Sequence, residues 1–414
     1  MRKDYRAMLR DNAVTIMFIV LCILSILCSG QSLSYVAYEL SGRLARNAFI
    51  ALALIIPIVA GMGINFAITI GAMAAQIAAL WITEWQIPGL GGFLLAALMI
   101  VPLAALFGFL IGKLLNKMKG QEMIGGMILG YFANGLYQLL FLFIFGNLIP
   151  LHTNGLVIKG STGVANTIEL NGIKYALDGI WRLDFSSALY LCAGLAAIFC
   201  VVKLLLKKDG NRKQTLGWLI GVAAAVALYQ IPAIKGIFSS IRVPMVTLVV
   251  IALLCLFNVA IMRTRLGQQF RAVGQNMTVA NASGINVDRV RVIAIMISTV
   301  LAAWGQLIFV QNFGVFQTYG AHEQVGLYAG AAILVGGASI VRATNAQAIL
   351  GCILFHTLFI VAPAAGNTLF GDAGIGEYFR VFISYGVIAL SLVLHGLRAM
   401  KAKNPANAIR EAGK

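Results

Sequence analysis

The chain has 414 residues, of which 60% are hydrophobic and only 11% charged. Soluble domains carry about 25% charged residues, so this composition excludes a water-soluble globular protein and indicates a surface covered by lipid. The formal net charge of +17 comes from 31 Lys and Arg against 14 Asp and Glu. In a membrane protein the positions of such charges carry more information than their sum, and the excess does not indicate a nucleic acid partner.

Most of the cations gather in five short clusters along the chain. Short loops rich in Lys and Arg stay on the cytoplasmic side of a membrane. Both termini are therefore predicted to be cytoplasmic. The clusters comprise Arg2, Lys3, Arg6 and Arg10; Lys113, Lys117 and Lys119; Lys203, Lys207, Lys208, Arg212 and Lys213; Arg263, Arg265, Arg271, Arg289 and Arg291; and Arg398, Lys401, Lys403, Arg410 and Lys414.

Apolar segments separated by polar residues predict an all-α polytopic membrane protein with about 10 to 12 transmembrane or half-spanning helices. Alternating sides from a cytoplasmic start places all five clusters inside. Three segments, 47–61, 215–231 and 325–341, are short for a span of about 20 residues and are predicted to include half-helices or re-entrant pieces. The segments lie at about residues 12–30, 47–61, 64–83, 91–112, 123–149, 185–205, 215–231, 244–262, 291–311, 325–341, 346–364 and 378–397.

A glycine-rich stretch at residues 61–76 places polar side chains at membrane depth. Its three glycines allow the backbone to leave helical geometry, and Asn65, Thr69 and Gln76 bring hydrogen-bonding groups into an apolar setting. Irregular backbone is tolerated at that depth only where it is buried in protein or lines a watery cavity. Two interpretations remain open: a broken helix pair beside a permeation path, and a tight helical hairpin packed by small residues.

Residues 150–184 form a polar external loop that is too long for a simple turn. Asn154-Gly155 and Asn171-Gly172 are turn signals, and the alternation in 167–170 is typical of a short strand. The loop could cap a pathway, serve as a docking surface for an external protein or be an ordered connection.

The chain lacks the patterns that enzymes and ion-coupled carriers need. All 14 acidic residues can be placed outside the apolar segments, which weakens an ion-coupled carrier mechanism without eliminating it. The four histidines are scattered, and no G-x-x-x-x-G-K-[ST] motif occurs. No catalytic residue, metal or cofactor is therefore predicted in this chain, and any ATP energy has to come from a partner.

The fourth basic cluster lies within a cytoplasmic segment, residues 263–291, that carries a short helix signal. Asn276 is suited to cap a helix over about Met277 to Ser283, and Gly284 is suited to end it at the C′ position. The sequence thus predicts a small-residue helix lying along the membrane surface between two spans.

This segment resembles the permease family of bacterial ABC importers that includes ribose-type, branched-chain amino acid and nucleoside permeases. The resemblance rests on the family pattern R-T-x-x-G-x-x-x-x-A-x-G-x-N-x-x-A-A-x-x-x-G-I-x-V. A second likeness is the apolar run that ends in Gly336-Gly337-Ala338-Ser339. The pattern is matched at Arg263, Thr264, Gly267, Ala272, Gly274, Asn276, Ala280, Gly284, Ile285 and Val287.

The resemblance implies a single permease domain over 1–414, similar to type II ABC importers, in the bacterial cytoplasmic (inner) membrane. It implies an external substrate-binding (lipo)protein, a second permease chain in a homodimer or heterodimer, and ABC ATPase subunits that hold ATP and Mg. Residues 150–231 look like an insertion with an extra helical hairpin. The expected ATPase-coupling residues are Gln275, Asn276, Ala280, Ala282, Gly284, Ile285 and Asp288.

The expected function is that of the permease subunit of an ATP-driven, binding-protein-dependent importer for a small polar solute. Neutral amides and hydroxyls on the predicted path favour a sugar or nucleoside, while a vitamin or amino acid remains open. The alternative is an ion-coupled secondary transporter or channel that acts without an ATPase. The expected path residues are Asn65, Phe66, Thr69, Gln76, Asn134, Trp304, Gln306 and Asn312.

Overall fold

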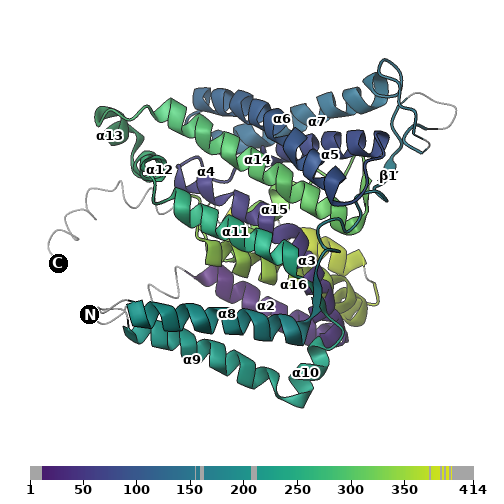
Figure 1. The fold of residues 1–414 in the computed structure, drawn as a ribbon. Helices are drawn as coiled ribbons and strands as arrows, with labels where there is room; N and C mark the ends of the chain where they lie inside the picture. Colours follow the sequence, from purple (N-terminus) through teal and green to yellow (C-terminus); the bar gives the residue numbers. More distant parts are fainter. Residues whose placement is uncertain are drawn as a thin grey trace.

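The computed structural model describes residues 12–153, 155–158, 163–206, 212–372, 374–382, 385–386, 388–390 and 393. The predicted all-α membrane fold is confirmed: helices of very different lengths form a bundle, with two short two-stranded sheets (Figure 1). The two predicted cytoplasmic ends of the chain, 1–11 and 394–414, lie outside the described residues, as does part of the predicted segment 378–397.

The elements follow one another in two halves on either side of residues 145–184, which contain β1 and β2. The first half contains α2 (Ala13–Ser29), α3 (Leu33–Ala53), α4 (Ile55–Val59), α5 (Ile68–Glu84), α6 (Gly89–Lys117), α7 (Glu122–Leu139) and the π-helical turn η1 (Leu140–Ile144). The second half contains α8 (Phe185–Leu206), α9 (Arg212–Tyr229), α10 (Pro232–Phe238), α11 (Met245–Ile261), α12 (Arg265–Gln275), α13 (Met277–Ala282), α14 (Val287–Phe313), α15 (Val325–Val335) and α16 (Asn345–Phe370). The strands are β1 (Thr167–Glu169), β2 (Arg182–Asp184), β3 (Arg242–Pro244) and β4 (Val315–Gln317).

Helix length and composition make this a multi-pass membrane protein. Within the described residues, 5 helices are long and apolar enough to cross a membrane, and up to 7 if each of two bent pairs counts as one span. Four further apolar helices are shorter, and α15 is one of them, as predicted for segment 325–341. The long helices are Leu33–Val59, Gly89–Lys117, Glu122–Ile144, Val287–Phe313 and Asn345–Phe370.

The second span begins earlier than predicted. Helix α3 starts at Leu33 rather than near residue 47, so the expected short segment is the end of a long helix. Glu39 and Arg43 lower the hydropathy of its first half, but they lie one helical turn apart and face each other at 3.9 Å. The Arg46 guanidinium lies 4.4 Å from the centre of the Phe313 ring. Charges with partners inside the protein are tolerated in a span, which hydropathy alone does not reveal.

The core of the bundle is built on α5 and α14, whose small residues permit close packing. A Cβ added at Gly71 of α5 would lie 3.2 Å from the Thr299 side chain of α14, and one at Gly108 of α6 would lie 2.7 Å from the Met296 backbone. Close backbone approach at small residues is typical of helix packing in membranes. Helices α6 and α7 cover this core and leave much of their own surface exposed to lipid.

Two opposite ends of the bundle carry different elements (Figure 1). The α13 end holds α12, α13 and the turn between α6 and α7, which is tied to the start of α14 by an ion pair between Lys119 and Asp288. At the other end, the strand pattern predicted at 167–170 is present as β1, which covers Thr167–Glu169. It pairs antiparallel with the distant β4, Ile168 opposite Phe316, rather than forming a local hairpin.

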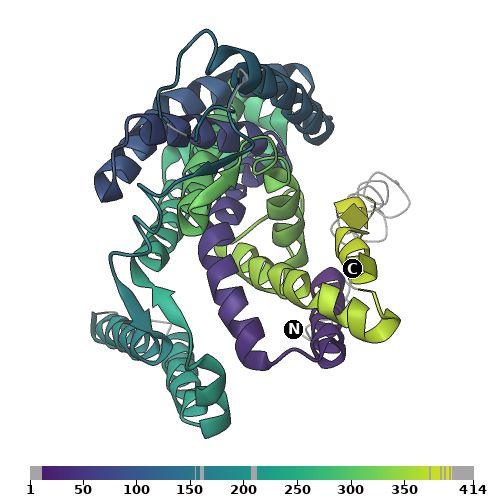
Figure 2. The same ribbon diagram turned by 90° about the vertical axis from the view of Figure 1, so that its right-hand side faces the viewer.

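The region predicted as an insertion contains a helical hairpin. Helices α8 and α9 pack on each other, and with α10 they lie to one side of the bundle in both views (Figures 1 and 2). The antiparallel pair β2 and β3 ties the two ends of this hairpin together, with Leu183 opposite Val243.

Candidate functional site

The short helix predicted from Asn276 is present as α13, at one end of the bundle. The Asn276 Oδ1 atom accepts a hydrogen bond from the Val279 backbone N–H at 3.1 Å, which is the expected N-cap. Gly284 has a φ of +81° and follows the C-cap Ser283, as predicted for C′, although the helix ends at Ala282. Of the expected coupling residues, Ala280 is buried, Ile285 is half-buried, and Gln275, Asn276, Ala282, Gly284 and Asp288 are exposed.

Helix α12 connects α13 to the interior of the bundle. Its N-cap is Thr264, whose hydroxyl accepts a hydrogen bond from the Gly267 N–H at 3.3 Å, and its Phe270 and Val273 side chains are buried. Near its end, Gly274 lies directly against Gly61: a Cβ added at Gly61 would lie 2.7 Å from the Gly274 Cα atom. The backbone at the end of α12 therefore contacts the glycine-rich stretch that follows α4.

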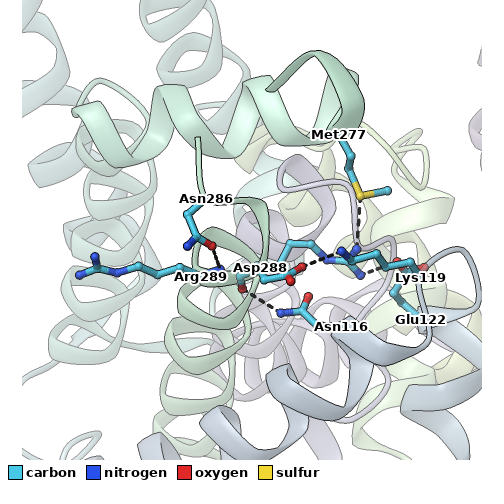
Figure 3. Close-up of polar contacts among 8 residues, drawn as sticks. Asn116, Lys119, Glu122, Met277, Asn286, Asp288 and Arg289 are labelled. Carbon is cyan, nitrogen blue, oxygen red and sulfur yellow. Dashed lines mark hydrogen bonds and ion pairs between the residues drawn. The ribbon is translucent and has the colours of Figure 1, made fainter. Parts of the chain in front are cut away.

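A buried ion pair lies beneath α13. The Arg291 guanidinium of α14 bonds the Glu122 carboxylate of α7, with 0% and 9% of the two side chains exposed. The Arg291 Nη1 atom also lies 3.3 Å from the Met277 sulfur, at the start of α13 (Figure 3). From its position in the sequence, Arg291 is predicted to belong to a cytoplasmic basic cluster, because nothing local signals a partner 169 positions away.

A second, exposed set of contacts surrounds the first turn of α14 (Figure 3). Lys119 Nζ lies 2.7 Å from Asp288 Oδ1, and Asn116 Nδ2 donates to the Asp288 carbonyl at 2.8 Å. Asn286 caps the helix by accepting from the Arg289 N–H at 2.9 Å. The turn between α6 and α7 is thus held against the α13–α14 connection.

The glycine-rich stretch, for which two interpretations were open, interrupts the helix: residues 60–67 between α4 and α5 are not helical. Gly61 and Gly63 have φ values of +77° and +67°. The Asn65 Oδ1 atom accepts from the Ala67 N–H at 3.1 Å, so this side chain serves its own backbone. Thr69 donates to the Phe66 carbonyl at 3.2 Å.

Beyond this break, a series of hydrogen-bonded polar side chains leads from the buried Gln76 to the exposed Glu323. Gln76 Oε1 accepts from the Tyr137 hydroxyl at 2.7 Å and lies 2.9 Å from His322 Nδ1. The other ring nitrogen of His322 lies 2.8 Å from Asn134 Oδ1, and Asn134 Nδ2 donates to Glu323 Oε1 at 3.0 Å. Gln76 and His322 are fully buried, whereas Glu323 is exposed.

The exposed end of this series of side chains, at Asn134 and Glu323, lines a pocket of about 150 Å³. A carboxylate, amides, a hydroxyl and two phenols face it together with the Phe66 ring, so it offers hydrogen bonds and an aromatic wall to a small polar molecule. Its lining residues are Phe66, Thr69, Met127, Gly130, Tyr131, Asn134, Glu323, Gln324, Leu327 and Tyr385.

The structure brings four of the eight expected path residues to this pocket or directly behind it: Phe66, Thr69, Asn134 and, through His322, Gln76. Sequence reasoning missed His322 and Glu323. Their signal was a polar pair immediately before a short apolar helix, at a point where the chain enters the protein without helical structure.

The other expected path residues lie elsewhere. Asn65 is buried in the break. Trp304 donates to the Ala97 carbonyl at 2.9 Å, so it packs on α6 instead of forming a stacking wall here. Gln306 donates to the Ala321 carbonyl at 3.3 Å, and Asn312 bonds Arg46 and Asp178 near the β1 end. Trp304, Gln306 and Asn312 belong to one long helix, α14, and their side chains bond other parts of the protein rather than facing this pocket.

Comparison with known proteins identifies the type of chain. The sequence pattern of the family described as "Branched-chain amino acid transport system / permease component" matches residues 39–394. The chain is also similar to a protein of Escherichia coli (strain K12) described as "Probable ABC transporter permease protein YphD", with 32% identity over 167 residues. That match covers 39% of this chain and spans about half, 47%, of the relative. No solved structure matches the chain.

Proposed function

Because the chain belongs to the branched-chain amino acid transport system permease family, and is thus a membrane permease component of an ABC transporter, we propose that it forms the solute path of a binding-protein-dependent importer. In this proposal two permease chains, as a homodimer or heterodimer, work with two ATPase subunits that hold ATP and Mg. An external substrate-binding (lipo)protein delivers the solute. The protein lies in a bacterial inner membrane, and its α13 end faces the cytoplasm.

The surface of α13 supports an ATPase partner at this end. Val279 is 60% exposed among small, neutral side chains. An open groove of about 810 Å³ runs beside the helix and is lined by residues that include Lys119, Asn281 and Asp288. An apolar residue on a protruding helix next to a polar groove is suited to docking on another protein. This surface is the single observation that carries the proposal of ATP-driven transport.

The pocket at Glu323 supports a small polar solute, with a sugar or nucleoside favoured. Among the described residues that line it, the charged side chain is the Glu323 carboxylate, which accepts hydrogen bonds from hydroxyl or N–H groups and repels anions. The neighbouring Thr69 and Asn134 add neutral hydrogen-bonding groups, and Phe66 offers a ring on which a sugar or base can stack. The external binding protein is expected to set selectivity before the solute reaches this pocket.

The proposal is tested by reconstituting the chain in vesicles with its ATPase and binding protein. Uptake of solute is expected only with all components, ATP and Mg present. The alternative is an ion-coupled secondary transporter or channel. It requires instead that the chain alone moves solute, either driven by an ion gradient or down the concentration gradient of the solute. Uptake by the chain alone would overturn the importer proposal.

Glu323→Gln is expected to lower solute uptake about tenfold, because a hydrogen bond to a charged group contributes about 1.5–3 kcal/mol. The matched control is Glu169→Gln, since Glu169 also accepts from an asparagine amide but lies on exposed β1. Initial uptake rates at equal amounts of assembled complex provide the measurement. Equal rates for both variants would remove Glu323 from the path.

A further inference from the structure

The ion pair between Glu122 and Arg291 links α13 to α7, a helix that lines the pocket. We call the surface of α13, together with the groove beside it, the coupling surface. Glu122 is the first residue of α7, and Arg291 lies in the second turn of α14. Both side chains are buried, and Arg291 also contacts Met277, the first residue of α13. Three helices therefore meet at one guanidinium group.

A buried ion pair makes this junction hard to separate. Opening it would leave a charge in a site from which water is excluded, and removing one partner of such a pair is strongly destabilising. The neighbouring pair of Lys119 and Asp288 differs, because its side chains are 47% and 61% exposed and are solvated when apart. The two pairs lie at the same end of the protein, but separating the buried pair costs more free energy than separating the exposed one.

Helix α7 continues from this junction to the pocket. Met127, Gly130, Tyr131 and Asn134 on the same helix line the pocket. At 1.5 Å per residue, Asn134 lies about 18 Å along the helix from Glu122. A regular helix moves as a unit over such a length, so a displacement of its first turn moves the pocket wall.

We propose that Glu122 and Arg291 are positioning residues that make α7 follow α13, so that movement of the coupling surface reshapes the pocket wall. The inference rests on the proposed function, since it assumes that an ATPase partner displaces α13. Arg291 carries the movement from Met277 to the Glu122 carboxylate, and α7 carries it to Tyr131 and Asn134. The pair acts on transport through its hold on α7 and does not touch the solute.

The test compares Glu122→Gln, nearly the same shape without the charge, with Arg242→Gln in the exposed ion pair that Arg242 of β3 makes with Asp184 of β2. In the full complex, Glu122→Gln is expected to lower the solute moved per ATP hydrolysed about tenfold, a typical size for coupling between sites. Arg242→Gln is expected to leave this ratio unchanged. The exchanged variant Glu122→Arg with Arg291→Glu is expected to restore the ratio, which a loss of stability elsewhere would not do.

Spin labels at Ala282 on α13 and Tyr131 on α7, both exposed positions, separate this inference from the proposed function. In the wild-type complex, nucleotide binding is expected to move both labels together, and in Glu122→Gln only the label on α13. A wild-type complex without ATP-driven uptake would refute the proposed function. Wild-type uptake with equal coupling in Glu122→Gln would refute the inference alone. If Glu122→Gln does not assemble, an exchanged variant that assembles without coupling also refutes it.

Discussion

Gly274→Ala is expected to lower both the stability and the transport activity of the protein. The added Cβ would lie against the Val59 carbonyl oxygen and 3.1 Å from the Gly61 nitrogen, so α12 has to move away from the end of α4. Forcing an extra methyl group into such a contact typically costs about 1–3 kcal/mol. The midpoint of thermal unfolding in detergent and the rate of ATP-driven uptake measure the two effects.

The matched control is Gly221→Ala on α9, where an added Cβ meets no atom within 4 Å. Alanine favours helix over glycine by about 1 kcal/mol, so this variant is expected to keep or slightly raise the midpoint. Uptake in the Gly274 variant should fall further than its stability alone explains, because the contact joins α12 to the break before Phe66. A Gly274→Ala protein with wild-type midpoint and uptake would contradict the close approach of these backbones.

Gly284→Val is expected to uncouple ATP hydrolysis from transport while the chain stays folded. The φ of +81° at this position is unfavourable for a β-branched residue and costs about 1–2 kcal/mol. No atom of another part of the described structure lies within 4 Å of the added Cβ, so the strain falls on the turn between α13 and α14. The variant should assemble, hydrolyse ATP and transport little solute in reconstituted vesicles.

Gly284→Asn tests the cause of this loss. Asparagine tolerates the left-handed conformation at a helix C′ position, so its coupling should remain close to wild type. If the asparagine variant loses coupling as well, the added bulk obstructs the partner surface rather than straining the turn. Normal transport by Gly284→Val would remove this turn from the coupling surface.

Local sequence signals predicted the α13 region well. The capping side chain of Asn276 and the left-handed position of Gly284 depend on residues within one or two helical turns, and the structure has both. The same holds for most helix limits, because hydropathy is a property of the segment itself. The predicted start of α3 was wrong because hydropathy counts its charges but does not reveal their partners: Glu39 and Arg43 face each other, and Arg46 lies over Phe313, far along the chain.

The site at Glu323 was only half predicted from the sequence. The polar residues of the glycine-rich stretch were recognised from their depth in an apolar segment, and Phe66 and Thr69 do line the pocket. His322 and Glu323 were passed over, because their meaning comes from Gln76 and Asn134, which are 246 and 189 positions away. Trp304 was predicted to line the path but does not. Its indole N–H donates to the Ala97 carbonyl of α6, a partner that only helix packing decides.

The sequence by itself determined that this chain lies in a membrane, is helical and carries a short capped helix within residues 263–291, because composition, hydropathy and capping act over short distances. Tertiary structure alone decided which distant groups meet. The pairing of β1 with β4, the contact of Gly61 with Gly274 and the burial of Arg291 with Glu122 all depend on how the helices pack. In a low-dielectric interior a charge or amide has to find a partner, but which partner is set by the three-dimensional arrangement of the helices.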